Sequence, residues 1–323
     1  MNVAGINLSP AIHALDATHL NWLIERYIHA SYLRLENTVT VDRYAAELHW
    51  FTRWWADDGP TRGWVINPED FVRFERHLRQ ARAKPLAYLT RHTIIKRLKE
   101  ALRWAHENGY LDRDYTKWIP PAVGAPPKRK AASIASLHRL IDAAGKSHKG
   151  RRLRDRCIVA MLMGIGLRRA EVTSLNIEDV IVEADHSGYV NVVGKRTKAN
   201  ADGRRAAAFD SATGVIIVEY LDSCAYTRGP LFLGERGGRL LGNGVYKVVK
   251  RAIAAASLEG EITGPHDLRR AFATHYKRNR REGGDMLRRQ LGHASFAQTA
   301  EYTLMEVDDI RAEMISPLSL RPE

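Results

Sequence analysis

The sequence predicts a mainly α-helical protein with a small antiparallel β-sheet, divided into an N-terminal helical bundle and a mixed α/β domain. Three observations carry this prediction. Apolar residues recur at helical spacing over most of the chain, one segment has the alternation of two short strands, and a proline-rich stretch separates the two parts. A length of 323 residues fits two domains of ordinary size.

The first domain, residues 1–118, is predicted to be a bundle of about four helices. Asn108 and Gly109 are typical of the end of the last helix. Apolar residues at helical spacing recur in four segments, at 20–28, 44–55, 71–78 and 95–105.

The stretch 119–132, IPPAVGAPPKRKAA, predicts a linker between the domains. It has four prolines, one glycine and a basic triplet, without an apolar period. Proline lacks a backbone donor and keeps the residue before it out of helical conformation, so this composition favours extended chain.

The second domain, residues 133–323, is predicted to mix helices with one hairpin. Segments 133–144 and 156–175 are helical in pattern, and 187–209 has two strands around a polar turn. Two or three more helices follow, and Ser295 with Gln298 has the spacing of a capping box. Near the end, Val307, Ile310 and Met314 are spaced as an amphipathic helix that stops before Pro317.

The net charge of +13, with a pI near 9.8, predicts a polyanionic partner. The charge is uneven, because residues 1–72 carry −4, residues 73–127 carry +7 and residues 128–323 carry +10. Basic residues cluster at 73–103, 128–156 and 266–289. Three clusters spread over both domains favour a cationic track for double-stranded DNA.

The longest strongly apolar run, 158–167, is well below the roughly 20 residues of a membrane-spanning helix. We therefore expect no membrane association. Cys157 and Cys224 are isolated, without the spacing of a metal site. This predicts a protein of the reducing cytoplasm with no bound metal.

Four segments of the second domain concentrate side chains suited to chemistry on a phosphodiester. Arginine's planar fork can hold two phosphate oxygens at once, and a tyrosine hydroxyl becomes a nucleophile when cations and a base lie near it. In chain order the candidates are Arg168 in GIGLRRAEV, Lys195 in VVGKRTK, His266 and Arg269 in GPHDLRRAFATH, and His293 and Tyr302 in LGHASFAQTAEYT.

In this order and spacing the four segments resemble the tyrosine recombinase (integrase) family, which includes the Xer recombinases and the phage integrases. The resemblance covers residues 133–305 and is strongest in 264–303. It implies a helical core-binding, DNA-binding domain at residues 1–118 and a tyrosine-recombinase catalytic domain after the linker. It also implies a homo-tetramer, or a tetramer with related recombinase subunits, on two DNA sites, with a C-terminal helix that docks on a neighbouring subunit.

The resemblance also implies a role for each catalytic residue. Tyr302 would attack the phosphate and form a 3′-phosphotyrosyl bond. Arg168 and Arg269 would clamp the phosphate, and Glu171 would position Arg168. Lys195 would be the general acid, with Lys198 as a second candidate. His266 would transfer a proton, and His293 would donate a hydrogen bond to the phosphate. The phosphotyrosyl bond keeps the energy of the broken one, so no cofactor is expected, and the sequence has no nucleotide-binding phosphate loop.

The expected function is site-specific DNA recombination, either integration and excision of an element or resolution of chromosomes and plasmids. Two alternatives stay open on sequence grounds. A type IB topoisomerase uses closely similar chemistry on a single duplex. A non-catalytic DNA-binding relative would bind DNA without need of the tyrosine.

Overall fold

The protein is described by a computed structural model over residues 17–35, 38–58, 66–80, 85–125, 130–146, 150–194, 203–279, 284–292 and 314–321. The chain forms two compact units, Met1–Lys128 and Arg129–Glu323, each with its own core. Several predictions concern residues outside the described ranges: those for Lys195, Lys198, His293 and Tyr302, the helix expected from Ser295, and the stretch 307–313.

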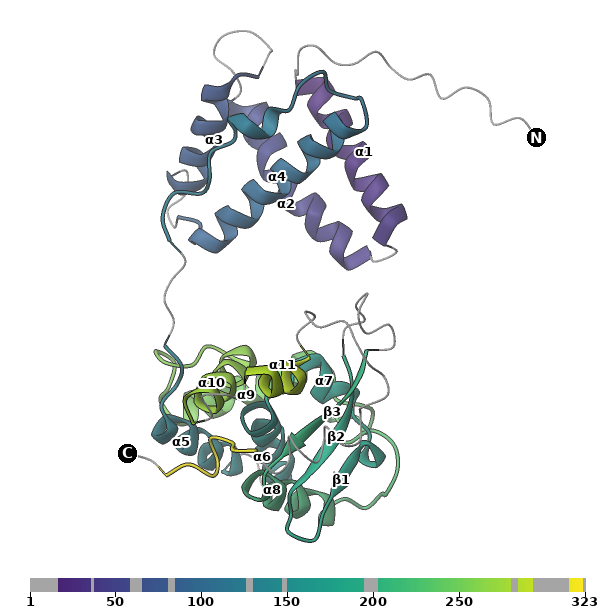
Figure 1. The fold of residues 1–323 in the computed structure, drawn as a ribbon, viewed down its shortest axis with the longest axis vertical. Helices are drawn as coiled ribbons and strands as arrows, with labels where there is room; N and C mark the ends of the chain where they lie inside the picture. Colours follow the sequence, from purple (N-terminus) through teal and green to yellow (C-terminus); the bar gives the residue numbers. More distant parts are fainter. Residues whose placement is uncertain are drawn as a thin grey trace, which may run out of the picture. The chain divides into compact units, whose positions relative to one another are not determined.

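The described part of the first unit is a bundle of the helices α1 to α4 (Figure 1). Phe51 is fully buried at its centre, where its ring stacks on Phe71 and meets Phe74 edge-on. Gly109 has a positive φ of 74° just after the last helix, which is the left-handed residue that commonly ends helices. The helices are α1 (Ala17–Leu35), α2 (Thr38–Asp58), α3 (Pro68–Gln80) and α4 (Tyr88–Glu107).

The chain that follows α4 packs on this bundle for most of its described length. Ile119 and Ala122 are buried in the bundle core. The Glu75 carboxylate accepts hydrogen bonds from the backbone N–H of Val123, at 3.1 Å, and from Arg91, at 2.7 Å. The proline-rich composition describes extended chain correctly, but apolar contacts attach residues 119–123 to the first unit.

The second unit places a three-stranded antiparallel sheet beside a group of helices (Figure 1). The strands, in the order β1-β2-β3, are β1 (Val180–Val182), β2 (Gly188–Val193) and β3 (Arg204–Phe209). The helices are α5 (Ile134–Gly145), α6 (Arg152–Ala160), α7 (Arg169–Ser174), α8 (Ser211–Asp222), α9 (Gly242–Ala255), α10 (Pro265–Asn279) and α11 (Gly284–Leu291).

The predicted fold class, mainly helical with a small antiparallel sheet, is confirmed. The hairpin β2–β3 forms as expected, and at its loop end the Gly194 N–H donates to Gly203 O, at 2.8 Å. Strand β1 is an addition, because three residues are too few to show an alternating pattern.

Helix α6 is the centre of the second core. Its residues from Cys157 onward, and the π-helical turn Met161–Ile165 that continues it, have no exposed surface. A π turn inserted in a helix is frequent at functional sites. The turn ends at Gly166 in the left-handed conformation, and the chain then reverses into α7.

The described end of the chain, residues 314–321, is irregular and packs on its own unit. Met314, expected as the last apolar position of a helix, lies against Phe272, Tyr276 and Leu291. The backbone N–H of Ser316 donates to the Asp210 carboxylate at 2.7 Å. Tertiary contacts with the second unit therefore determine the conformation of this segment.

Candidate active site

Arg168 is held by Glu171 at the start of α7. The Glu171 carboxylate accepts from the backbone N–H of Arg168, at 2.7 Å, and from Nη1 of the same residue, also at 2.7 Å. Glu171 is buried, whereas the side chain of Arg168 is 37% exposed. The predicted contact between these two residues is present, and it leaves part of the Arg168 guanidinium open to solvent.

Arg269 reaches the same carboxylate from α10. Its side chain is 6% exposed, and its Nη1 lies 3.7 Å from Oε2 of Glu171. Nη1 also donates to Gly166 O and Nη2 to Leu291 O, each at 2.6 Å. The structure thus brings the two predicted arginines together on one buried acid, although 101 positions separate them in the sequence.

Local sequence explains how α10 presents Arg269. Pro265 occupies the first position of the helix, where its missing N–H costs nothing. Asp267 accepts from the N–H and hydroxyl of Thr263, at 2.7 and 2.6 Å, which fixes the chain entering the helix. His266 is exposed in this first turn, three residues before Arg269, so both lie on neighbouring positions of one helix.

The charges of the cluster shift the ionisation of its members. Burial alone would favour neutral Glu171, but the Arg205 charge and the hydrogen bonds from Arg168 hold the pKa of this carboxyl below its ordinary value. Burial and the neighbouring Arg168 charge lower the pKa of Arg269 to about 10. Glu171 is therefore ionised and Arg269 charged at neutral pH.

Two residues of the cluster, Arg205 and Gln290, were missed by the sequence analysis. Arg205 on β3 donates from Nη2 to Oε2 of Glu171, at 3.1 Å, and from Nε to the backbone oxygen of Gln290, at 3.2 Å. The Gln290 side chain is fully buried and bonds both the N–H and the oxygen of Ala208. A charged residue within a short strand was the one available signal for Arg205.

Two of the described ranges end at a glycine next to this cluster. Gly292 directly precedes His293, and its carbonyl oxygen accepts from Nη2 of Arg168 at 3.2 Å. Gly194 directly precedes Lys195, and a Cβ atom added to it would lie 3.2 Å from Oε1 of Glu171. The segments leading toward Lys195 and His293 thus both reach the Arg168–Glu171 pair.

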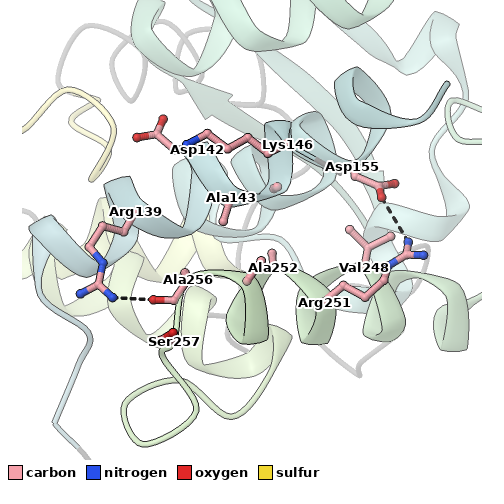
Figure 2. A pocket seen from close by; sticks show the side chains of 12 residues that line it. Arg139, Asp142, Ala143, Lys146, Asp155, Val248, Arg251, Ala252, Ala256 and Ser257 are labelled. Atoms are coloured by element: carbon pink, nitrogen blue, oxygen red, sulfur yellow. Dashed lines mark hydrogen bonds and ion pairs between the residues drawn. The ribbon is translucent and has the colours of Figure 1, made fainter. Parts of the chain in front are cut away.

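A cavity of about 520 Å³ lies elsewhere in the second unit, between α5, α6 and α9. Alanines, including Ala143 and Ala252, form part of its wall (Figure 2). An ion pair between Arg251 and Asp155 lies at one end, and Arg139 bonds the carbonyl of Ala256 at the other (Figure 2). None of the described candidate residues lines this cavity.

Within the described ranges, no group of three or more histidine, cysteine or acidic side chains is placed to hold a metal ion. No helix in the same ranges has the length and apolar character needed to cross a membrane.

The sequence of the second unit matches a known family. Residues 134–307, more than half of the chain, match the phage integrase family. The chain belongs to the phage integrase family. Within that family it is a tyrosine-type site-specific recombinase, and this assignment is favoured over the topoisomerase and the non-catalytic DNA-binding relative.

Two relatives show how far the similarity extends. The chain is 26% identical over 297 residues to a tyrosine recombinase XerD of Listeria monocytogenes, covering 88% of this chain and 94% of the relative. It is 34% identical over 202 residues to a XerD of Corynebacterium glutamicum, covering 59% of this chain and 62% of that one. The family similarity thus extends into the first unit.

Solved structures share the fold. XerH recombinase in a pre-cleavage complex with its difH substrate superposes with a TM-score of 0.68 at 19% identity, covering 88% of this chain and 92% of XerH. A lambda integrase dimer bound to a COC′ core site gives a TM-score of 0.63 at 17% identity, covering 85% of this chain and 95% of that one. At these identities the similarity establishes the fold.

Proposed function

We propose that this protein cuts and rejoins duplex DNA at specific sites through a covalent 3′-phosphotyrosyl intermediate on Tyr302. The observation that carries the proposal is the meeting of Arg168 and Arg269 on buried Glu171. The acid orients both guanidinium groups while keeping them charged. The cluster has an excess of positive charge that a phosphate can neutralise.

The clamp acts where negative charge develops during the reaction. As the nucleophile approaches phosphorus in line with the leaving oxygen, charge grows on the non-bridging oxygens. Arginine N–H groups oriented in advance, in a site partly shielded from water, stabilise that charge without reorganising. Glu171 and the carbonyls of Gly166 and Leu291 supply the orientation for Arg168 and Arg269.

In the proposed step the Tyr302 oxygen bonds to phosphorus and its hydroxyl proton leaves, with His266 as the proton-transfer partner. The bond between phosphorus and the 5′-oxygen breaks, and Lys195 gives that oxygen a proton. Lys198 is the alternative general acid. His293 donates a hydrogen bond to a non-bridging oxygen. Rejoining reverses the step with the 5′-hydroxyl of another strand, so the reaction consumes no ATP.

Both units are proposed to contact DNA. The first unit, through residue 118, acts as the core-binding domain, and residues 133–323 form the catalytic domain. The charge of +7 over residues 73–127 and +10 over 128–323 supports phosphate contacts from both. We place the reaction in the cytoplasm.

Assembly as a homo-tetramer on two DNA sites is part of the proposal. A lambda integrase tetramer bound to a Holliday junction is among the structures that share the fold. Since residues 314–321 pack on their own unit, substitutions at Val307 and Ile310 test subunit docking more cleanly than deletion of the tail. Val307→Asp with Ile310→Asp should spare binding to one site and weaken assembly of two-site complexes on native gels. Unchanged assembly would contradict the docking role.

The decisive experiment captures the covalent intermediate. The full chain is incubated with random-sequence duplexes and a chelator, denatured in detergent, and the attached DNA is sequenced to find the site. Duplexes carrying that site, with a nick beside the cleavage position, then release a short 5′-hydroxyl fragment and trap the adduct. The wild-type protein should accumulate a protein–DNA adduct that resists denaturation.

Two tyrosine variants make the assay specific. Tyr302→Phe should bind the site and form no adduct. Tyr246→Phe, which alters an exposed tyrosine on α9 of the same unit, should form adduct as the wild type does. Adduct formed by Tyr302→Phe would overturn the assignment of the nucleophile, and absence of adduct with the wild-type protein would overturn the function.

A further inference from the structure

We propose that Arg205 is a positioning residue for strand transfer, which holds Glu171 and the end of α11 so that Arg168 and Arg269 present their N–H groups to the phosphate. The inference rests on the proposed function and deepens it. Arg205 is outside the set of catalytic residues identified from the sequence.

Arg205 joins three segments of the second unit with one side chain. From β3 it donates to Glu171 at the start of α7 and to the backbone of Gln290 in the last turn of α11. A Cβ atom on Gly292 would lie 2.8 Å from Nε of Arg205, so the guanidinium fills the space beside the end of α11. Movement of Arg205 would therefore disturb all three segments.

Burial makes this position energetically unfavourable for the charge of Arg205. The Arg205 side chain is 11% exposed, and burial lowers its pKa below the ordinary value. Its Nη1 atom is buried without a hydrogen-bond partner among the described residues. Well-packed apolar residues in place of buried charges are often neutral or stabilising, so stability alone gives no reason for an arginine here. The reason for an arginine at position 205 is the ionised Glu171, whose negative charge it neutralises.

The two oxygens of Glu171 are used differently. Oε1 accepts only from Nη1 of Arg168, at 2.7 Å, among the bonds of the described residues. Oε2 accepts from the Arg168 N–H at 2.7 Å and from Arg205 at 3.1 Å, while Arg269 stays at 3.7 Å. Without Arg205, only the Arg168 N–H would remain hydrogen-bonded to Oε2. Arg269 could then move closer to this oxygen, which would turn one of its N–H groups away from the phosphate.

Arg205 also connects the two segments that lead toward the remaining catalytic candidates. On β3 it is opposite Val192, two residues before Gly194, and Lys195 follows next in the sequence. Through Gln290 it holds the turn that ends at Gly292, just before His293. The Arg205 side chain thus links the loop end of the β2–β3 hairpin to the end of α11.

The test compares binding with cleavage in the nicked-duplex assay. Arg205→Met should bind the site within about threefold of wild type, yet form adduct about 100-fold more slowly in single-turnover reactions, as expected for misplaced catalytic groups. Arg205→Lys should recover part of the rate, because it restores the charge near Glu171 without reaching Gln290 as well. Arg228→Met, an exposed arginine on the loop after α8, controls for loss of charge and should cleave at the wild-type rate.

A double-mutant cycle separates positioning from a merely structural role. If Arg205 acts through Glu171, Arg205→Met combined with Glu171→Gln should be no slower than Glu171→Gln alone. Fully additive losses, equal losses of binding and cleavage, or a wild-type rate in Arg205→Met would each overturn the inference. If the wild-type protein forms no adduct, the proposed function has failed instead, so the two failures are distinguishable.

Discussion

Arg269 donates a hydrogen bond of 2.6 Å to the carbonyl oxygen of Gly166, the left-handed residue that ends the π turn two positions before Arg168. This bond fixes helix α10 to the segment that presents the other arginine of the clamp. The separation of the two guanidinium groups is therefore determined by backbone geometry as well as by Glu171.

Replacing Arg269 with lysine should remove most of the cleavage activity. A single ammonium cannot donate to Gly166 O and Leu291 O in the arrangement of the planar fork and still face a phosphate. We expect adduct formation to slow by about 100- to 1,000-fold, the loss typical of a transition-state donor, with DNA affinity changed much less. Single-turnover cleavage and equilibrium binding on the same duplex measure both. A lysine variant with wild-type cleavage would show that the fork is not needed.

Gly166→Ala should destabilise the second unit. The backbone at this position has φ of 76°, and a Cβ atom would lie 2.5 Å from Phe272 Cδ1 and 3.0 Å from Leu291 Cδ2. Strain and overpacking together should lower the free energy of unfolding by about 2–4 kcal/mol. Urea denaturation measures it. Gly260→Ala, where a Cβ would meet nothing within 4 Å, is the matched control and should change stability little.

Glu171→Gln should lower the free energy of unfolding at neutral pH and make this free energy less dependent on pH in the acid range. The pKa of Glu171 in the folded protein lies below its ordinary value of 4.5, so on acidification the unfolded chain takes up the proton first. The ionised Glu171 contributes its full stabilisation above about pH 5. This contribution to the free energy of unfolding is lost as the pH falls through the lowered pKa of the folded protein. Removing the buried partner of three arginines should cost about 3 kcal/mol at pH 7.

The measurement for Glu171 is the difference in unfolding free energy between wild type and Glu171→Gln at several pH values. This difference should shrink between pH 5 and the lowered pKa, because both proteins then carry a neutral side chain at this position. A difference that stays constant down to pH 3 would contradict the ionised role of Glu171.

Asp210→Ala should release the described end of the chain. One oxygen of Asp210 accepts from the Thr213 N–H, at 3.0 Å, at the start of α8, and the other accepts from the Ser316 N–H at 2.7 Å. Loss of the helix cap should cost about 1–2 kcal/mol, and hydrogen exchange over residues 314–321 should accelerate. Asp222→Ala, an exposed acid at the other end of α8, is the control. Unchanged exchange in Asp210→Ala would show that apolar contacts alone hold the segment.

The sequence alone was enough to predict the two-part helical architecture, the β2–β3 hairpin, and the pairing of Arg168 with Glu171. The architecture and the hairpin depend on local patterns, namely apolar periodicity and strand alternation, whereas the pairing of Arg168 with Glu171 was implied by the resemblance. Motif order also predicted that Arg269 acts together with Arg168, and the structure places both at Glu171, since a resemblance carries long-range information that periodicity lacks. The role of His266 stays a prediction.

Only the tertiary structure could reveal Arg205, Gln290, and the attachment of residues 119–123 to the bundle. Arg205 meets Glu171 across 34 positions and the end of α11 across 85, and Gln290 reaches Ile165 across 125. Such contacts leave no period in the sequence, because they exist only after β3, α7 and α11 have packed. The residue types proposed to perform the chemistry are visible in the sequence, but the buried charges that orient them depend on which strands and helices become neighbours.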